Sequence, residues 1–332
     1  MEKRLQEVLQ LQEEYIQSMA KMNMHGVYDD FWGAPGAKAA KGQADAPAKS
    51  APQAGGEEQP TERLEDLLKE LDGYIGLASV KEQVRGLVNW IAVNRMRARN
   101  GLPQAELSLH MIFSGNPGTG KTMIARLMAR ILKSIGILQK GVLVEVDRGG
   151  LVAGYVGQTA AKTDAAIRSA LGGVLFIDEA YALVSRGEND FGQEAIETLL
   201  KQMEDHRDEL VVIAAGYPRQ MEAFLHANPG LESRFTRFWH FPDYSIEELL
   251  AIFEIRCTSS GYCLAPAARP KLGGVLAARV REDCEGFGNA RGVRNLFEET
   301  AARQANRLAA LPPEKITKEA LMCLTEDDLP PL

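Results

Sequence analysis

A glycine-rich run from Gly115 to Thr122 constrains this chain more than any other feature of its sequence. The run fits the phosphate-loop pattern G-x-x-x-x-G-K-S/T. It follows a short apolar run and precedes a helical stretch predicted over 123–132, which is the context that such a loop requires. Glycines let successive backbone N–H groups point at phosphates, and the helix adds the positive end of its dipole. The run therefore predicts a nucleotide-phosphate site.

Two side chains of this loop have individual roles in such a site. We expect Lys121 to reach the β- and γ-phosphates, and Thr122 to offer its hydroxyl to Mg²⁺. The predicted nucleotide-binding residues of the loop are Asn116, Pro117, Gly118, Thr119, Gly120, Lys121 and Thr122.

An apolar run over 174–177 ends in two acids, Asp178 and Glu179. We expect this strand to lie beside the strand of the phosphate loop, which would place Asp178 near the Mg²⁺. Glu179 would then orient and deprotonate an attacking water. Because a kinase of small molecules has less use for a water-activating glutamate, the acid pair favours hydrolysis over phosphoryl transfer.

Short apolar runs flanked by turn residues predict the strands of a sheet. Helical stretches alternate with them, which predicts an α/β fold with a parallel sheet covered on both faces. The predicted strands are 109–113, 142–146, 174–177, 210–215 and, more weakly, 238–241. Predicted helices over 63–71 and 79–100 precede the first strand.

After Pro242 and Asp243 we expect the strands to stop and a helical domain to begin. Ser245 and Glu248 form a capping box at its start, and a small helix is predicted near 317–321. The predicted division of the chain is an N-terminal amphipathic helix (1–32), a flexible linker (33–60), an α/β nucleotide-binding domain (61–243) and a helical lid domain (244–332).

The predicted N-terminal helix has apolar residues at steps of three and four along one face. Two interpretations stay open: the helix packs on the body of its own chain, or it docks on a partner or neighbouring subunit. The following stretch is rich in Ala, Gly, Pro, Lys and Gln and has almost no large apolar residue, so it predicts a flexible linker.

Composition limits the partners and the compartment. The formal net charge of −7 argues against nucleic acid, since phosphate binding generally needs a basic surface. No stretch approaches the roughly 20 apolar residues of a membrane span, so we predict no membrane partner and a cytoplasmic location. The cysteines make no C-x-x-C pair and are predicted to be reduced thiols: Cys257, Cys263, Cys284 and Cys323.

Together these motifs resemble the AAA+ ATPases, and within them the CbxX/CfqX subfamily, which includes the red-type Rubisco activases and the stage V sporulation protein K type. The resemblance extends from about Leu67 to Arg307. Besides the two motifs above, it rests on Asp72–Leu77 with Val80 and Lys81, Tyr155–Thr159, Ala215–Pro218, Asn228–Leu231, Ser233–Phe235, Phe241–Tyr244, Asn289–Arg291 and Val293–Asn295. It implies a parallel five-stranded sheet in the order 5-1-4-3-2, a small α-helical lid, ATP and Mg²⁺ as cofactors, and a homo-oligomeric ring, expected to be a hexamer.

The resemblance also implies roles for residues outside the two motifs. Ile75 and Gly76 match the segment that cradles adenine between the domains. Arg291 matches the sensor-2 arginine, which reaches the γ-phosphate from the lid, and Arg294 follows closely. Arg234 matches the arginine finger that completes the site of a neighbouring subunit, with Arg237 as a second candidate.

Tyr155 and Val156 match the pore loop, which in the family faces the central channel and grips a substrate peptide. Tyr155 lies beside a glycine with little else apolar around it, which favours an exposed aromatic side chain. The sequence departs from the family at the end of the fourth strand. Ala215, Gly216 and Tyr217 stand where many AAA+ proteins have a polar sensor-1 asparagine, so the residue that positions the water is not assigned.

These features are compatible with three functions. We favour an ATP-driven motor that remodels a protein substrate, with an adaptor as a possible partner of the N-terminal helix. The alternative is a nucleotide-switched binding or scaffold protein with slow ATPase activity. A DNA loader or helicase is disfavoured by the acidic charge. Rubisco and sporulation partners are both open as targets.

Overall fold

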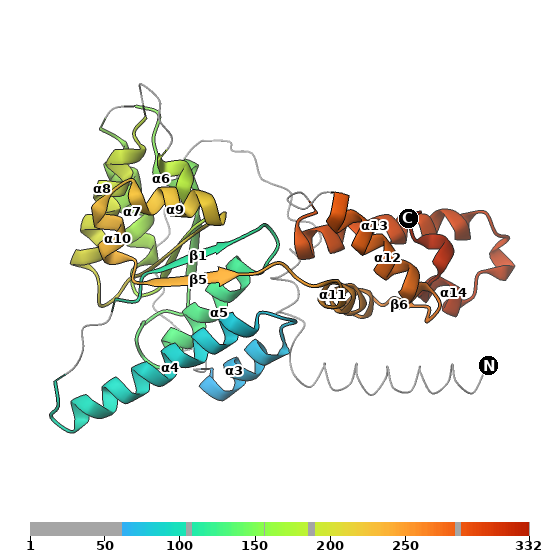
Figure 1. Ribbon diagram of the computed structural model, residues 1–332, viewed down its shortest axis with the longest axis horizontal. Helices are drawn as coiled ribbons and strands as arrows, with labels where there is room; N and C mark the ends of the chain where they lie inside the picture. The colour runs from blue at the N-terminus through green and yellow to red at the C-terminus, as the bar shows by residue number, and fades with distance from the viewer. Residues whose placement is uncertain (1–61, 104–107, 156, 185–189, 283–286, 332) are drawn as a thin grey trace, which may run out of the picture.

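The computed structural model describes residues 62–103, 108–155, 157–184, 190–282 and 287–331. An α/β part contains a five-stranded sheet, and a helical part follows it in sequence and extends from one side of it (Figure 1). The helix and linker predicted within 1–60 lie outside the described residues.

The sheet is parallel throughout, with strand order β2-β3-β4-β1-β5. Read from its other edge this is 5-1-4-3-2, so the predicted fold class is confirmed. The strands are β1 (Met111–Gly115), β2 (Leu143–Val146), β3 (Val174–Ile177), β4 (Val211–Gly216) and β5 (Arg237–Phe241).

The prediction that β3 lies directly beside β1 was wrong. β4 lies between β1 and β3, because Ala214 pairs with Ile112 on one side and with Ile177 on the other. The chain places β2 and β3 further out and then returns with β4 to the position beside β1, an order that motif spacing does not encode. Since parallel strands end at the same edge, β1 and β3 still deliver their motifs to one edge of the sheet.

Two layers of helices cover the sheet because alternate strand residues face opposite sides. Met111 and Phe113 belong to the core beneath α3 (Leu64–Gly73), α4 (Ala78–Arg99) and α5 (Lys121–Ser134). Ile112 belongs to the second core, on the other face. That face is covered by α6 (Arg148–Leu151), α7 (Thr159–Ala170), α8 (Gly192–Asp205), α9 (Pro218–His226), α10 (Pro229–Arg234) and the 3-10 helix η1 (Ala180–Val184).

The helical part begins at the predicted capping box. The Ser245 hydroxyl accepts from the Glu248 amide at 3.2 Å, and the Ser245 amide donates to the Glu248 carboxylate at 2.8 Å. The helices that follow are α11 (Ile246–Ser259), α12 (Ala268–Glu282), α13 (Asn289–Ala309) and the short α14 (Lys318–Met322) predicted near this position.

The expectation that strands stop after Asp243 was wrong in one respect. Strands β6 (Cys263–Leu264) and β7 (Cys323–Leu324) form a small parallel pair in the helical part. Strands this short give no periodic pattern in the sequence. Gln304 on α13 holds β7, because its amide donates to the Cys323 carbonyl at 2.9 Å. The cysteines of this region, Cys257, Cys263 and Cys323, are free thiols, and Cys284 lies outside the described residues.

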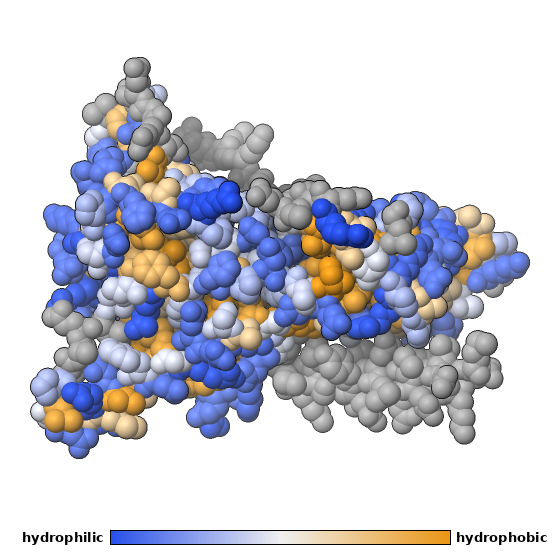
Figure 2. Space-filling model, in the orientation of Figure 1, coloured by the Kyte–Doolittle hydropathy of each residue, from blue (hydrophilic) through white to orange (hydrophobic). Residues whose placement is uncertain are grey.

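The face of the molecule shown in Figure 2 is mostly hydrophilic, with scattered apolar side chains. A small group is exposed near the C-terminal end of α4: Val93, Met96 and Leu102. Among the described helices, none combines the length and the apolar character that crossing a membrane takes.

Candidate functional site

The phosphate loop lies at the end of β1, between Gly115 and the first residue of α5, Lys121. Gly118 and Gly120 have positive φ angles of +71° and +94°, which favour glycine. At Gly118 there is also no room for a side chain, since a Cβ would lie 2.2 Å from the Gly288 carbonyl oxygen. The loop therefore has the strand–loop–helix context that its pattern predicts.

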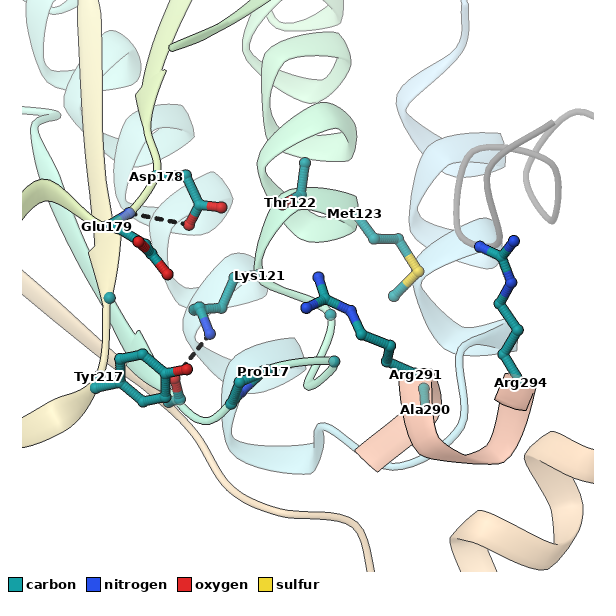
Figure 3. Close-up of a pocket in the computed structure, with 14 residues that line it drawn as sticks. Pro117, Lys121, Thr122, Met123, Asp178, Glu179, Tyr217, Ala290, Arg291 and Arg294 are labelled. Atoms are coloured by element: carbon teal, nitrogen blue, oxygen red, sulfur yellow. Dashed lines mark hydrogen bonds between the residues drawn. The ribbon is translucent and has the colours of Figure 1, made fainter. Parts of the chain in front are cut away.

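A cavity of about 300 Å³ opens over this loop (Figure 3). Of the predicted loop residues, Pro117, Gly118, Gly120, Lys121 and Thr122 line it. Two others support the loop: the Thr119 hydroxyl donates to the Asn116 carbonyl at 2.8 Å, and the Asn116 amide donates to Asp243.

Among the cationic residues that line the cavity, Lys121 has the largest shift in pKa. Its ammonium donates to the carbonyls of Gly115 at 2.7 Å and Asn116 at 2.9 Å. Burial lowers the pKa of Lys121 to about 8, against the opposing effect of the Asp178 carboxylate, and the Arg291 guanidinium lowers it further. A lysine with this pKa gains or loses its proton near neutral pH.

The pKa of Lys121 predicts how ATP affinity depends on pH. A phosphate group needs the ammonium form, which is present below pH 8 and lost above it. We expect the affinity for ATP to be constant below pH 8 and to fall by up to about tenfold per pH unit above it. Calorimetric titration between pH 7 and 9.5, in buffers of different ionisation enthalpy, measures both the affinity and the proton uptake.

The matched control for this titration is Lys121→Arg, which stays charged over the whole range. It should bind ATP with no such pH dependence. Equal affinity of the unmodified chain at pH 7 and 9.5, without proton uptake, would contradict the prediction.

Asp178 and Glu179 enter the same cavity from the end of β3. Asp178 is half-buried and anchored by its amide, which donates to the Val146 carbonyl at 2.8 Å. Glu179 is exposed and has a φ of +49°, and its amide donates to the Asp178 carboxylate at 3.1 Å. A left-handed backbone costs a non-glycine residue about 1 kcal/mol or more, so the surrounding structure holds Glu179 in this turn. Thr122 and Asp178 thus line one cavity, as Mg²⁺ ligation would require.

The helical part closes the other side of the cavity. Arg291 and Arg294, from the first two turns of α13, line it together with the loop (Figure 3). Ala290 donates its amide to the Gly118 carbonyl at 3.2 Å, so α13 begins in direct contact with the loop. Arg291 therefore shares a cavity with the phosphate loop, and its role at the γ-phosphate stays a prediction.

Asp243, in the connection between the two parts, joins them in a way that sequence reasoning missed. Its carboxylate accepts from Asn116 at 2.9 and 3.0 Å and from Asn289 at 2.8 Å. Asn289 also accepts from the Tyr244 amide at 3.0 Å. The only signal in the sequence was that Asp243 and Asn289 both fall within the family motifs.

Other predicted residues lie away from the cavity. Within the described ranges, neither Ile75 nor Gly76 lines it; Gly76 lies against Glu248 and Tyr244. Tyr244 connects this region to the loop, because its hydroxyl donates to the Thr119 carbonyl at 3.4 Å. Tyr155 is 74% exposed on the segment after α6, and Val156 lies outside the described residues.

Arg234 and Arg237 lie at the opposite end of the sheet. They line a second cavity, of about 840 Å³, with residues that precede β1, Ser108 to His110, whereas the phosphate loop follows β1. Parallel strands of this length span about 16 Å. Arg234 therefore cannot act at the phosphate loop of its own chain.

Within the described ranges, Arg234 and Arg237 have few hydrogen-bond or ion-pair partners to balance their positive charges. Within the described part of the chain, the buried Nε atoms of both have no hydrogen-bond partner. Among the described residues, the one carboxylate paired with Arg234 is that of Glu204, at 3.9 Å. Burial lowers the pKa of Arg237, and the same environment lowers the pKa of His110 to about 4, so that this histidine is neutral. Part of the Arg234 side chain, 29% of it, remains exposed on this face.

Comparison with known proteins gives two family matches. The model described as "ATPase family associated with various cellular activities (AAA)" matches residues 111–243, and the model of the AAA lid domain matches 245–332. Stage V sporulation protein K of Bacillus subtilis is 43% identical over 267 residues, which cover 80% of this chain and 82% of that protein. The chloroplastic ribulose bisphosphate carboxylase/oxygenase activase of Cyanidioschyzon merolae is 44% identical over 272 residues, 82% of this chain and 91% of that protein.

A further relative, protein CbbX of Cereibacter sphaeroides, is 44% identical over 269 residues, 81% of this chain and 85% of that protein. Among solved structures, the Holliday junction branch migration motor RuvB of Thermotoga maritima has a TM-score of 0.50 at 18% identity, over 78% of this chain and 68% of that one. At that identity the likeness concerns the fold alone.

Proposed function

The chain belongs to the AAA family of ATPases, and on this premise we propose that it assembles into a ring and uses ATP hydrolysis to remodel a protein substrate. The predicted resemblance to the CbxX/CfqX group is confirmed by the relatives above. Family membership supports nucleotide binding and ATPase activity; the ring and the protein substrate belong to the proposal.

The residues of the first cavity supply the hydrolytic groups of one subunit. Lys121 and the loop amides hold the phosphates, and Arg291 adds a positive charge from the lid. The hydroxyl of Thr122 and the carboxylate of Asp178 would hold Mg²⁺, which neutralises charge that develops on the phosphate oxygens. Glu179 would take a proton from the attacking water.

The position of Arg234 is the observation that supports assembly into a ring. It lies at the far end of the sheet from the phosphate loop, in a cavity where its Nε and that of Arg237 have no partner among the described residues. A heterologous contact, in which this face of one copy meets the nucleotide of the next, would supply the missing anion and would close into a ring. A guanidinium delivered across such an interface stabilises transition-state charge.

The exposed Tyr155 supports a protein substrate. An aromatic side chain that is 74% exposed, between Gly154 and Gly157, is available to grip a peptide. The segment before it is held firmly, since Lys162 donates to the carbonyls of Gly149 at 2.6 Å and Val152 at 3.1 Å. The printed names of the relatives point to different processes, so we propose a protein target without naming it.

Replacing Tyr155 separates a motor from a nucleotide-switched scaffold. We expect Tyr155→Ala to keep basal ATPase activity within about twofold, because the side chain is exposed and away from the cavity. Remodelling of a partner captured by the Glu179→Gln form should be lost. The measurements are steady-state ATPase activity and protease sensitivity of that partner with and without ATP.

Tyr155→Phe is the matched control, because it keeps the aromatic side chain and removes only its hydroxyl. It should retain remodelling. A Tyr155→Ala form that still remodels the partner at the unmodified rate would favour the scaffold with slow ATPase activity.

A further inference from the structure

Three consecutive carbonyl groups of the phosphate loop, those of residues 117–119, accept hydrogen bonds from outside the loop. The side-chain amide of Asn289 donates to the first at 3.3 Å, the backbone amide of Ala290 donates to the second at 3.2 Å, and the hydroxyl of Tyr244 donates to the third at 3.4 Å. A carbonyl and the N–H group of the same planar peptide unit point in opposite directions. These bonds therefore orient the three peptide units that contain the amides of residues 118–120.

Asn289 uses its whole side-chain amide in this contact. The nitrogen donates to the Pro117 carbonyl at 3.3 Å and to the Asp243 carboxylate at 2.8 Å, and the oxygen accepts from the Tyr244 amide at 3.0 Å. The residue is 8% exposed and has a φ of +50°, a conformation that asparagine adopts more readily than most residues. Replacing a buried amide of this kind by a group that cannot donate leaves its partners unsatisfied, which is costly.

Asp243 connects this asparagine to the phosphate loop. Its carboxylate accepts from the side chain of Asn116 at 2.9 and 3.0 Å and from that of Asn289 at 2.8 Å. Bonds to a charged acceptor are stronger than bonds between neutral groups. We call Asn116, Asp243 and Asn289 the clasp, since one carboxylate joins the loop to the lid. Within the described residues none of the three lines the cavity, so an effect of the clasp on hydrolysis has to pass through other residues.

Arg291 is the residue that the clasp would place. It lies two positions after Asn289, and in Figure 3 its side chain extends from α13 in the direction of Lys121. The loop and the lid are in close contact here, because a Cβ at Gly118 would lie 2.9 Å from the backbone nitrogen of Arg291. A displacement of the start of α13 would therefore move the guanidinium of Arg291 relative to the phosphate loop.

We propose that Asn289 is a positioning residue: bonded to Asp243, it holds the start of α13 against the phosphate loop and so places Arg291 for hydrolysis. This inference rests on the proposed function, in which Arg291 adds a positive charge from the lid. It extends that function by assigning the placement of the arginine to side chains that do not line the cavity. A misplacement of about 1 Å can cost about 10²-fold in rate, so such a contact can control hydrolysis without touching ATP.

The test replaces the amide of Asn289 by a carboxylate of the same shape. Asn289→Asp loses both donors and sets a second negative charge against Asp243. We expect kcat/KM for ATP to fall about tenfold or more. In an Arg291→Ala background, which is itself impaired, the same change should cost less than about twofold, since the arginine that the clasp places is then absent. Single-turnover hydrolysis with excess enzyme measures the slow rates.

A rescue variant separates the placement of Arg291 from general damage to the fold. Combining Asp243→Asn with Asn289→Asp exchanges the amide and the carboxylate between the two positions, so that the pair can bond again. Activity should return to within about threefold of the unmodified chain. Asn306→Asp, exposed on the same helix, is the control for the added charge and should leave kcat/KM unchanged.

The proposal is overturned if Asn289→Asp hydrolyses ATP at the unmodified rate, if it lowers kcat/KM equally with and without Arg291, or if the exchanged pair is no more active than Asn289→Asp alone. Should circular dichroism show that Asn289→Asp does not fold, Asp243→Asn alone takes its place and should show the same dependence on Arg291. Failure of the proposed function is a different result, namely full activity of Arg291→Ala.

Discussion

Replacing Glu179 by glutamine is expected to lower kcat for ATP hydrolysis by about 10²–10⁴-fold, the usual contribution of a general base. The amide keeps the size of the side chain and its place in the turn at φ +49°, but it cannot take a proton from water. Binding should persist, because Lys121, Thr122 and the loop amides are unchanged. Phosphate release and ATP titration measure the two effects separately.

The Glu179→Gln variant also tests whether the subunits assemble into a ring. If ATP holds neighbouring subunits together, the Glu179→Gln form should accumulate as a ring in ATP, which light scattering coupled to size-exclusion chromatography detects. Glu222→Gln, on the exposed surface of α9, is the control for losing one negative charge. A Glu179→Gln chain that stays monomeric in ATP and hydrolyses at the unmodified rate would contradict both roles.

Replacing Arg234 by alanine should cost about 10³-fold or more in kcat, the contribution of a guanidinium supplied across an interface. ATP binding to the separate subunit should be unaffected, since Arg234 lies at the other end of the sheet from the loop. Arg269→Ala, an exposed lid arginine paired with Glu254, is the matched control and should keep full activity.

A mixing experiment shows whether Arg234 acts on a neighbour. Arg234→Ala and Glu179→Gln are each inactive, but in mixed rings some sites receive an intact Glu179 from one subunit and an intact Arg234 from the next. With equal, random mixing roughly a quarter of the sites are complete, so activity should return to that level. If the mixture stays as inactive as its components, Arg234 acts within its own chain or has no role in hydrolysis.

The local chemistry of the site was predictable because it depends on residues that are contiguous in the sequence. The loop from Gly115 to Thr122 needs its glycines and its lysine at fixed offsets, and the strand that ends in Asp178 and Glu179 needs a buried run before the acids. Alternation of apolar runs and helical stretches was sufficient for the parallel sheet. The capping box at Ser245 was predictable for the same reason, since both partners lie within one helical turn.

The sequence by itself determined that this chain forms a phosphate-binding α/β domain followed by helices, since each of those features depends on neighbours in the chain. Only the tertiary structure decided which distant residues share a site. The joining of Asn116 and Asn289 through Asp243, and the approach of α13 to the loop at Gly118, both depend on packing between separate elements. The separation of Arg234 from the loop belongs with them, because the two ends of a strand are adjacent in sequence but face opposite sides of the molecule.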